Sequence, residues 1–148
     1  MTIDNDIEVL LVEDSPDDLD MALRALRKAH LANRIQVARD GAEALEFIFG
    51  TGAHNGRKVE NGPKVILLDL KLPKIDGLEV LRRVKSDPRT KMIPVVVLTS
   101  SKEQPDVVEC YNLGVNSYIV KPVNFERFAS AVAELGMYWL LLNHPPKS

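Results

Sequence analysis

The chain has 148 residues, of which 45% are hydrophobic and 27% are charged, and its formal net charge is −2 at pH 7. This length favours one domain over residues 1–148, and the small negative charge gives no reason to expect a nucleic-acid partner. The lone Cys110 excludes an internal disulfide, the acidic N-terminus is no signal peptide and no apolar run could span a membrane, so we expect a cytoplasmic protein.

Five short apolar runs recur along the chain, at residues 8–13, 34–38, 64–70, 94–100 and 115–120. Three of them are almost continuous in Val, Ile and Leu, which is typical of central strands in a parallel sheet that is covered on both faces. Pro94 is tolerated because it stands at the first position of its run.

Helical patterns separate the runs, at residues 15–29, 40–49, 76–86, 104–112 and 124–143. Ser15, Asp40, Asp76 and Asn124 are each suited to cap a helix N-terminus. The alternation of strand and helix predicts an α/β fold, a doubly wound five-stranded parallel sheet. Residues 50–62 interrupt this rhythm, and their glycine-rich, polar sequence predicts an exposed loop.

Polar side chains stand at the ends of four of the five apolar runs. These are Glu13 and Asp14, Asp69, Thr99 with Ser100, and Lys121. In an open α/β sheet, ligands bind beyond the carboxyl ends of the strands, so we expect these side chains to converge at one edge.

Three carboxylates at one edge repel each other unless they share a cation, and Mg²⁺ suits carboxylate, carbonyl and water ligands. With a hydroxyl and an ammonium close by, the set suggests that Asp69 attacks phosphorus and forms an aspartyl phosphate. Lys121 and the metal would then neutralise the charge on the transferring group.

Each of these residues also has an ordinary structural interpretation. Glu13 and Asp14 could be solvated acids at a strand end, and Thr99 could be a β-branched strand residue. Lys121 could be a surface lysine, and a half-buried Tyr118 needs no function. For Glu13, Asp14, Thr99 and Lys121, their occurrence at strand ends together with Asp69 favours the phosphoryl-transfer interpretation, whereas for Tyr118 both interpretations stay open.

The same residues resemble a known family. Glu13-Asp14, Asp69, Thr99 and Lys121-Pro122, with Asp76-Gly77 after Pro73, look like the receiver domain of two-component response regulators. The spacing of Asp69, Thr99 and Lys121 matches that family, and the resemblance covers nearly the whole chain. It implies a flavodoxin-like strand order, 2-1-3-4-5, and a single receiver domain.

The resemblance also implies a phosphorylation site and a metal site. Asp69 would accept a phosphoryl group from a histidine of a sensor kinase. Asp14, Asp69 and the Lys71 carbonyl would bind Mg²⁺, and Glu13 would assist through water.

A switch is implied as well. Thr99 and Lys121 would contact the phosphoryl group, and Tyr118 would turn inward when Thr99 moves towards it. The Lys121–Pro122 peptide would be cis, a minority state even before proline.

The insertion at residues 50–62, the opening VEDSPDD and the ending YWLLLNHPP resemble the small single-domain regulators that are paired with bacterial phytochromes. We therefore expect a phytochrome-type sensor histidine kinase as partner. In the last helix, Tyr138 and Leu141 lie off the stripe that would pack on the core. This second apolar face predicts an isologous homodimer, with irregular packing of the tail as the alternative.

Two other functions compete with the switch. A phosphoaspartyl hydrolase of the haloacid-dehalogenase kind needs an acid two residues after its nucleophile, and Lys71 stands there instead. A degenerate receiver that only binds partners would not need the complete set of acids, hydroxyl and lysine. We therefore expect a regulator with at most self-dephosphorylation and not an enzyme, which signals through a protein partner.

Overall fold

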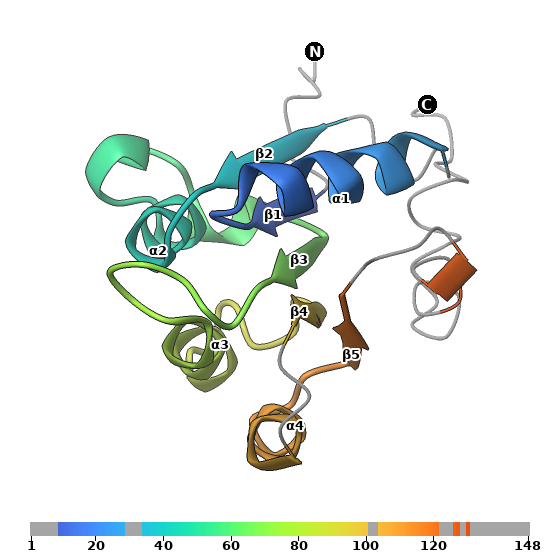
Figure 1. The fold of residues 1–148 in the computed structure, drawn as a ribbon. Helices are drawn as coiled ribbons and strands as arrows, with labels where there is room; N and C mark the ends of the chain where they lie inside the picture. Colours follow the sequence, from blue (N-terminus) through green and yellow to red (C-terminus); the bar gives the residue numbers. More distant parts are fainter. Residues whose placement is uncertain (1–8, 29–33, 101–103, 122–125, 128–129, 131–148) are drawn as a thin grey trace, which may run out of the picture.

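The computed structural model describes residues 9–28, 34–100, 104–121, 126–127 and 130, which are drawn as coloured ribbon in Figure 1. Five parallel strands form one sheet in the order β2-β1-β3-β4-β5. The strands are β1 (Val9–Val12), β2 (Ile35–Ala38), β3 (Val65–Leu68), β4 (Val95–Thr99) and β5 (Ser117–Val120). The predicted fold class and strand order are therefore confirmed.

Helices cover both faces of the sheet within the described part of the chain. They are α1 (Pro16–Lys28), α2 (Gly41–Phe49), α3 (Gly77–Ser86) and α4 (Gln104–Asn112). Figure 1 shows α1 on one side of the strands and α2, α3 and α4 around the other side. None of these described helices is long and apolar enough to cross a membrane.

The hydrophobic core is divided by the sheet into two clusters. Leu26 of α1 packs with Leu11 of β1 and Leu67 of β3 on one face, and the half-buried Leu19 and Leu23 cover them. On the other face, α2, α3 and α4 pack against the alternate strand residues, such as Val97. Central strands buried on both faces explain why their sequences are almost continuously apolar.

The predicted helix caps at Ser15, Asp40 and Asp76 are present. The Asp40 carboxylate accepts the Glu43 amide at 2.7 Å, and Asp76 accepts the Glu79 amide at 2.9 Å. Ser15 Oγ accepts the Asp18 amide at a longer 3.4 Å. These bonds satisfy amides that have no partner inside the helix, and so determine where each helix begins.

The segment predicted as an exposed loop, residues 50–62, is mostly exposed but contains two short 3₁₀ helices, Gly52–His54 and Val59–Asn61. Arg57 holds the segment to α2. Its guanidinium donates to the Phe47 carbonyl at 2.6 Å and to the Asn61 carbonyl at 2.9 Å, and lies 3.7 Å from the centre of the Phe47 ring.

Two sequence predictions lie outside the described residues. Most of the final helix predicted at residues 124–143 is one, including its cap Asn124 and the predicted interface residues Tyr138 and Leu141, although residues 126, 127 and 130 are described and are helical. The cis peptide at Lys121–Pro122 is the other, because Pro122 is not described.

Candidate phosphoryl-acceptor site

The backbone holds the residues that follow the strands in register at one edge of the sheet. The Glu13 amide donates to the Ala38 carbonyl at 2.9 Å, and the Asp69 amide donates to the Val12 carbonyl at 3.1 Å. The Lys121 amide donates to the Thr99 carbonyl at 2.9 Å. Parallel pairing thus continues beyond the strands and brings Glu13, Asp69 and Lys121 together, as the sequence predicts.

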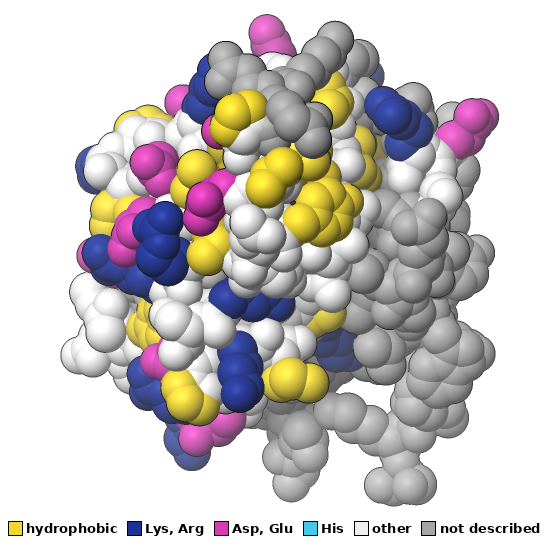
Figure 2. All heavy atoms as spheres, turned by 90° about the horizontal axis from the view of Figure 1, so that it is seen from below, with side chains coloured by type: hydrophobic (Ala, Val, Ile, Leu, Met, Phe, Trp, Pro, Cys, Tyr) yellow, Lys and Arg dark blue, Asp and Glu magenta, His cyan; other side chains and the backbone are white. Residues whose placement is uncertain are grey.

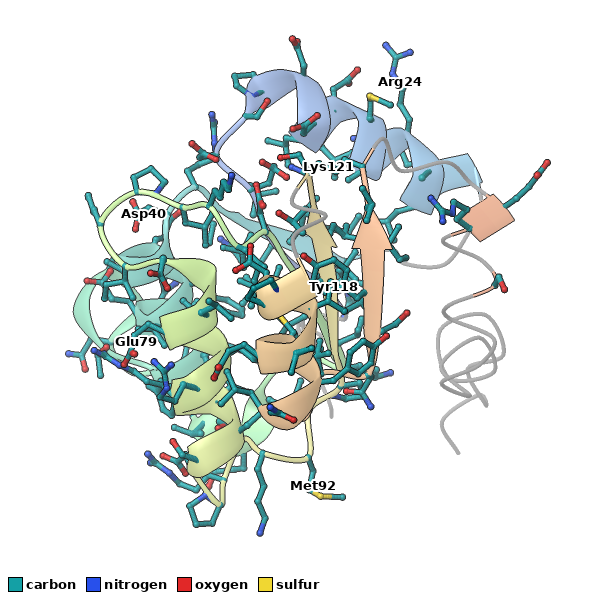
Figure 3. The ribbon with its side chains drawn as sticks, turned by 60° about the horizontal axis from the view of Figure 1, so that its bottom comes forward. Arg24, Asp40, Glu79, Met92, Tyr118 and Lys121 are labelled. Atoms are coloured by element: carbon teal, nitrogen blue, oxygen red, sulfur yellow. The ribbon has the colours of Figure 1, made fainter. Side chains whose placement is uncertain are left out.

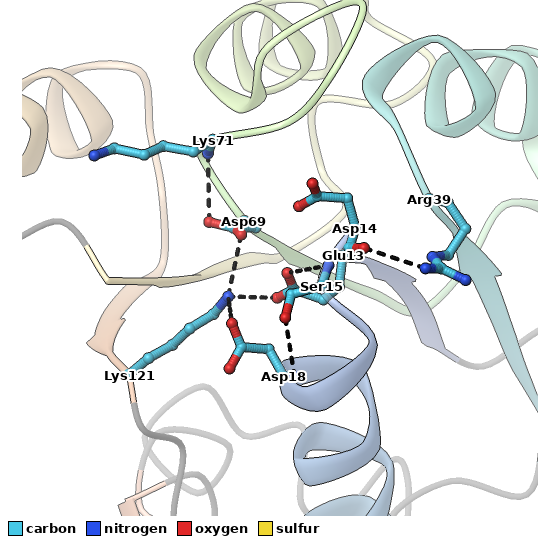
Figure 4. Close-up of polar contacts among 8 residues, drawn as sticks. All are labelled: Glu13, Asp14, Ser15, Asp18, Arg39, Asp69, Lys71 and Lys121. Carbon is cyan, nitrogen blue, oxygen red and sulfur yellow. Dashed lines mark hydrogen bonds and ion pairs between the residues drawn. The ribbon is translucent and has the colours of Figure 1, made fainter.

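Lys121 is at the centre of the site (Figure 4). Its Nζ donates to Glu13 Oε1 at 2.6 Å, to Asp18 Oδ2 at 2.9 Å and to Asp69 Oδ2 at 3.1 Å. The side chains of Lys121, Glu13 and Asp69 are at most 9% exposed. The ammonium therefore holds together acids from three parts of the chain in an environment with little water, where charge pairs interact strongly.

A close approach of two backbone segments shapes the chain around Asp69. The Gly77 amide donates to the Leu70 carbonyl at 2.8 Å. A Cβ on Gly77 would lie 2.2 Å from the Asp69 carbonyl oxygen and 2.6 Å from Leu70 Cα, so only glycine fits there. Asp69 Oδ1 accepts the Lys71 amide at 3.3 Å. Gly77 of the Asp76-Gly77 pair thus supports the loop that carries Asp69.

The loop between β3 and α3 is also attached to the start of α2. The Gly41 amide donates to the Pro73 carbonyl at 3.3 Å, and a Cβ on Gly41 would lie 1.8 Å from the Ile75 carbonyl oxygen. Lys74 has a left-handed φ of 68° and its ammonium lies 3.4 Å from Asp40. Rigid contacts therefore position the loop on both sides.

Three carboxylates of the site could hold a divalent metal ion. Glu13, Asp14 and Asp69 each offer an oxygen, and these oxygens lie within 4.8 Å of one another. Asp14 is more exposed than the other two, and its carbonyl accepts Arg39 Nη2 at 3.1 Å. Oxygen ligands with one open side match the preference of Mg²⁺, which keeps several waters.

An open hollow of about 370 Å³ adjoins this cluster. It is lined by Asp14, Leu70, Lys71, Leu72, Pro73, Asp76, Leu78 and Asp106. Leu70 and Lys71, which directly follow Asp69, line this hollow together with Asp14, so it lies beside the loop that carries the acceptor carboxylate.

The crowding of charges changes two protonation equilibria. Burial raises the pKa of the Glu13 carboxyl from 4.5 to about 7, and the charge of Asp69 adds to the rise, while the hydrogen bond from Lys121 opposes it. Burial alone would lower the pKa of Lys121, but its bonds to Glu13, Asp18 and Asp69 outweigh burial and raise it. Lys121 is therefore charged at neutral pH, and the acids compete for it.

Thr99 and Tyr118 face the same side of the sheet. Thr99 ends β4 and is fully buried. It follows Val97 by two residues, and Val97 pairs with Tyr118 of β5. Tyr118 is half-buried against the cluster that includes Val97 and Cys110. Figure 3 shows Lys121 at the end of β5 beside α1, with Tyr118 lower on the same strand. This arrangement is compatible with the predicted switch pair.

The sequence prediction missed Asp18. An acid in the first turn of a helix is already explained by its favourable interaction with the helix dipole, so nothing in the pattern pointed to a second contact. Asp14 precedes α1, which begins at Pro16, so no helical spacing links Asp18 to the acids at the strand end.

Comparisons with known proteins agree with this geometry. A family model described as the response regulator receiver domain matches residues 9–133. Response regulator Rcp1 from Synechocystis sp. is 40% identical over 134 residues, which cover 89% of this chain and 88% of Rcp1. The crystal structure of the Mn²⁺-bound form of Rcp1 has a TM-score of 0.76 and 36% identity, covering 96% of this chain and 99% of that one.

Two further solved structures carry phytochrome names. The bacteriophytochrome response regulator RtBRR is 52% identical with a TM-score of 0.83, covering 95% of this chain and 84% of that one. The phosphorylated cyanobacterial phytochrome response regulator RcpA is 38% identical with a TM-score of 0.74, covering 90% of this chain and 94% of that one.

Proposed function

The chain belongs to the response regulator receiver family of phosphorylation-controlled signalling domains, and from this premise we propose that Asp69 accepts a phosphoryl group from a sensor histidine kinase. The observation that carries the proposal is the contact of Lys121 Nζ with Asp69 Oδ2 at 3.1 Å, beside the acids Glu13 and Asp14. An acceptor carboxylate, a cation and a metal-binding cluster are the parts that phosphoryl transfer to an acid requires.

The proposed step exchanges one bond to phosphorus for another. A carboxylate oxygen of Asp69 bonds to phosphorus while the bond from phosphorus to the imidazole nitrogen of a phosphohistidine breaks, and that nitrogen keeps the electron pair. Lys121 donates to the phosphoryl oxygens and balances their charge. The Thr99 hydroxyl contacts the phosphoryl group, and Tyr118 follows its movement.

Glu13, Asp14, Asp69 and the Lys71 carbonyl would hold Mg²⁺ in this proposal. When bound, the ion supplies positive charge to the acids and to the phosphoryl oxygens. Removal of Asp14, the most exposed of the three acids, tests the assignment. With EDTA as reference, Mg²⁺ should raise the unfolding midpoint of the wild type, and Asp14→Ala should reduce that rise, because ligand binding stabilises the folded state. An Mg²⁺-induced rise of the same size in Asp14→Ala would contradict this role.

Incubation with acetyl phosphate and Mg²⁺ tests the phosphorylation site. Intact-mass measurement should show the gain of one phosphoryl group in the wild type and none in Asp69→Asn. Asp20→Asn is the matched control, because Asp20 is an exposed acid of α1 that pairs with Arg24. Phosphorylation of Asp69→Asn at the wild-type rate, or none of the wild type, would contradict the proposal.

The names of RtBRR and RcpA support a phytochrome-type kinase as donor. Transfer from a purified, labelled bacteriophytochrome kinase should then be faster than transfer from an unrelated histidine kinase. Equal rates would remove the phytochrome assignment and leave the receiver function intact.

We propose a switch and not a phosphohydrolase. Lys71 occupies the place of the acid that a hydrolase of the haloacid-dehalogenase kind needs, and in Figure 4 its side chain points away from Asp69. Steady multiple turnover on a phosphate ester would favour the hydrolase instead.

The signal would leave through a protein partner that binds near α4 and β5. Figure 2 shows hydrophobic side chains among the charged ones on the face seen from below, and Val108 and Tyr111 of α4 are 46% and 52% exposed. The homodimer, the cytoplasmic location and the lack of nucleic-acid and membrane partners stay predictions. Sedimentation at micromolar concentration, with and without a phosphate mimic, tests the homodimer.

A further inference from the structure

Asp18 is the partner of Lys121 in Figure 4 that has no role in the function proposed above. An ammonium group has three N–H bonds, and those of Lys121 point to Glu13 at 2.6 Å, Asp18 at 2.9 Å and Asp69 at 3.1 Å. All three donors are therefore occupied by carboxylates. A phosphoryl oxygen can gain a donor from Lys121 only by replacing or sharing one of these acceptors.

The three acids differ in how easily they can give up the ammonium. Glu13 and Asp69 are 4% and 8% exposed, whereas the Asp18 side chain is 37% exposed. A buried carboxylate that loses its partner is not compensated by water, but an exposed one is rehydrated. Asp18 is thus the acceptor that Lys121 can leave at the lowest cost.

Asp18 is also held in place. It lies in the first turn of α1, and its amide donates to Ser15 Oγ at 3.4 Å. Its backbone is therefore fixed by the helix start, and its carboxylate, which accepts Lys121 Nζ at 2.9 Å, attracts the ammonium and repels other anions. A phosphoryl group on Asp69 would compete with it for the same cation.

We propose that Asp18 is a positioning residue that restrains phosphorylation, because its carboxylate holds the Lys121 ammonium towards α1 and competes with the phosphoryl oxygens for it. This inference rests on the proposed function of Asp69. The ion pair between Asp18 and Lys121 is stronger before the phosphoryl transfer than during it, so it raises the barrier. Removing the Asp18 charge should therefore make the transfer faster.

Asp18→Asn and Asp17→Asn, in the full chain at saturating Mg²⁺, separate this role from a general effect of charge. Asp17 is an exposed acid in the same turn, so both variants lose one negative charge from the start of α1. The measured quantity is the rate constant of phosphorylation by acetyl phosphate. This small donor avoids any effect of the substitutions on the docking of a protein kinase.

We expect phosphorylation of Asp18→Asn to be about two- to fivefold faster than that of the wild type, which is the range of a partly exposed ion pair. Asp17→Asn should differ from the wild type by less than about twofold, because screening weakens the effect of an exposed charge. An Asp18→Asn rate equal to or below that of the wild type, or an equal acceleration in Asp17→Asn, would overturn the inference. If the wild type itself takes up no phosphoryl group, the proposed function fails instead.

A second measurement follows Lys121 directly and does not depend on the reaction. The ¹⁵N–¹H signal of the Lys121 ammonium, assigned with Lys121→Arg, should shift in Asp18→Asn and stay in place in Asp17→Asn. A Lys121 signal that is the same in the wild type and in Asp18→Asn would show that Asp18 does not hold the ammonium in solution. This would overturn the inference even if the variant were less stable.

Discussion

Neutralisation of Glu13 should stabilise the metal-free protein at alkaline pH. Glu13 is buried, and its pKa is raised from 4.5 to about 7, so its ionised form costs folding free energy. The difference between these two values corresponds to about 3 kcal/mol at about 1.4 kcal/mol per pH unit. Glu13→Gln keeps the shape of the protonated acid, and Lys121 keeps its bonds to Asp18 and Asp69.

The sign of the pH dependence follows from proton binding. Between pH 4.5 and about 7 the folded wild type holds a proton on Glu13 that the unfolded chain has lost, so its free energy of unfolding falls as the pH rises. Above pH 7 the whole cost is present. Glu13→Gln has no such cost and should be about 1–3 kcal/mol more stable than the wild type at pH 8, with no difference below pH 4.5.

Urea denaturation in EDTA at several pH values between 4.5 and 8 measures this difference. Glu60→Gln, at an exposed acid of the loop, is the control and should follow the wild type at every pH. A Glu13→Gln protein that is as stable as the wild type or less stable at pH 8 would refute the reasoning. The bond from Lys121 would then outweigh the burial of Glu13.

Three further substitutions or treatments test the packing. In a urea titration, Gly77→Ala should lower the free energy of unfolding by at least about 2 kcal/mol, because the added Cβ meets backbone atoms, and it should slow the phosphorylation of Asp69. The control Gly62→Ala, whose Cβ would have its nearest contacts at 3.3 Å, should lower the free energy of unfolding by less than about 1 kcal/mol. Cys110 is fully buried with a pKa raised to about 11, so Ellman's reagent at pH 8 should react with it only in urea. Arg57→Ala should cost about 1–3 kcal/mol in urea and speed proteolysis within residues 50–62; unchanged proteolysis would show that Arg57 does not hold this loop.

Most of the sheet could be predicted because its strands are buried on both faces. Such strands need apolar residues at every position, so the acid Asp69 marks the point where the strand ends. Because packing does not require an acid there, Asp69 is also a candidate site residue. The predicted runs were longer than the strands at several ends. Glu13, Leu70 and Ser100 lie beyond the strands because the chain turns there into the loops of the site.

Other features depend on contacts that leave no periodic signal. Arg57 joins the loop to α2 by a hydrogen bond to the Phe47 carbonyl and by stacking on the Phe47 ring. Every residue has a carbonyl group, so this hydrogen bond leaves no mark in the sequence. The bond of Asp18 to Lys121 joins residues that are 103 positions apart, and an acid at a helix start is common without such a bond. These contacts are determined by tertiary structure.

The wide sequence separation of the acids around Lys121 has a consequence for the newly made chain. Lys121 meets Glu13, Asp18 and Asp69 across 108, 103 and 52 positions, so the first and last strands must both be in place before the ammonium finds its partners. A chain still lacking β5 would carry Asp69 without its cation and would be a poor phosphoryl acceptor. Under the proposed function, uptake of the phosphoryl group therefore requires β1, β3 and β5 to be assembled in one sheet.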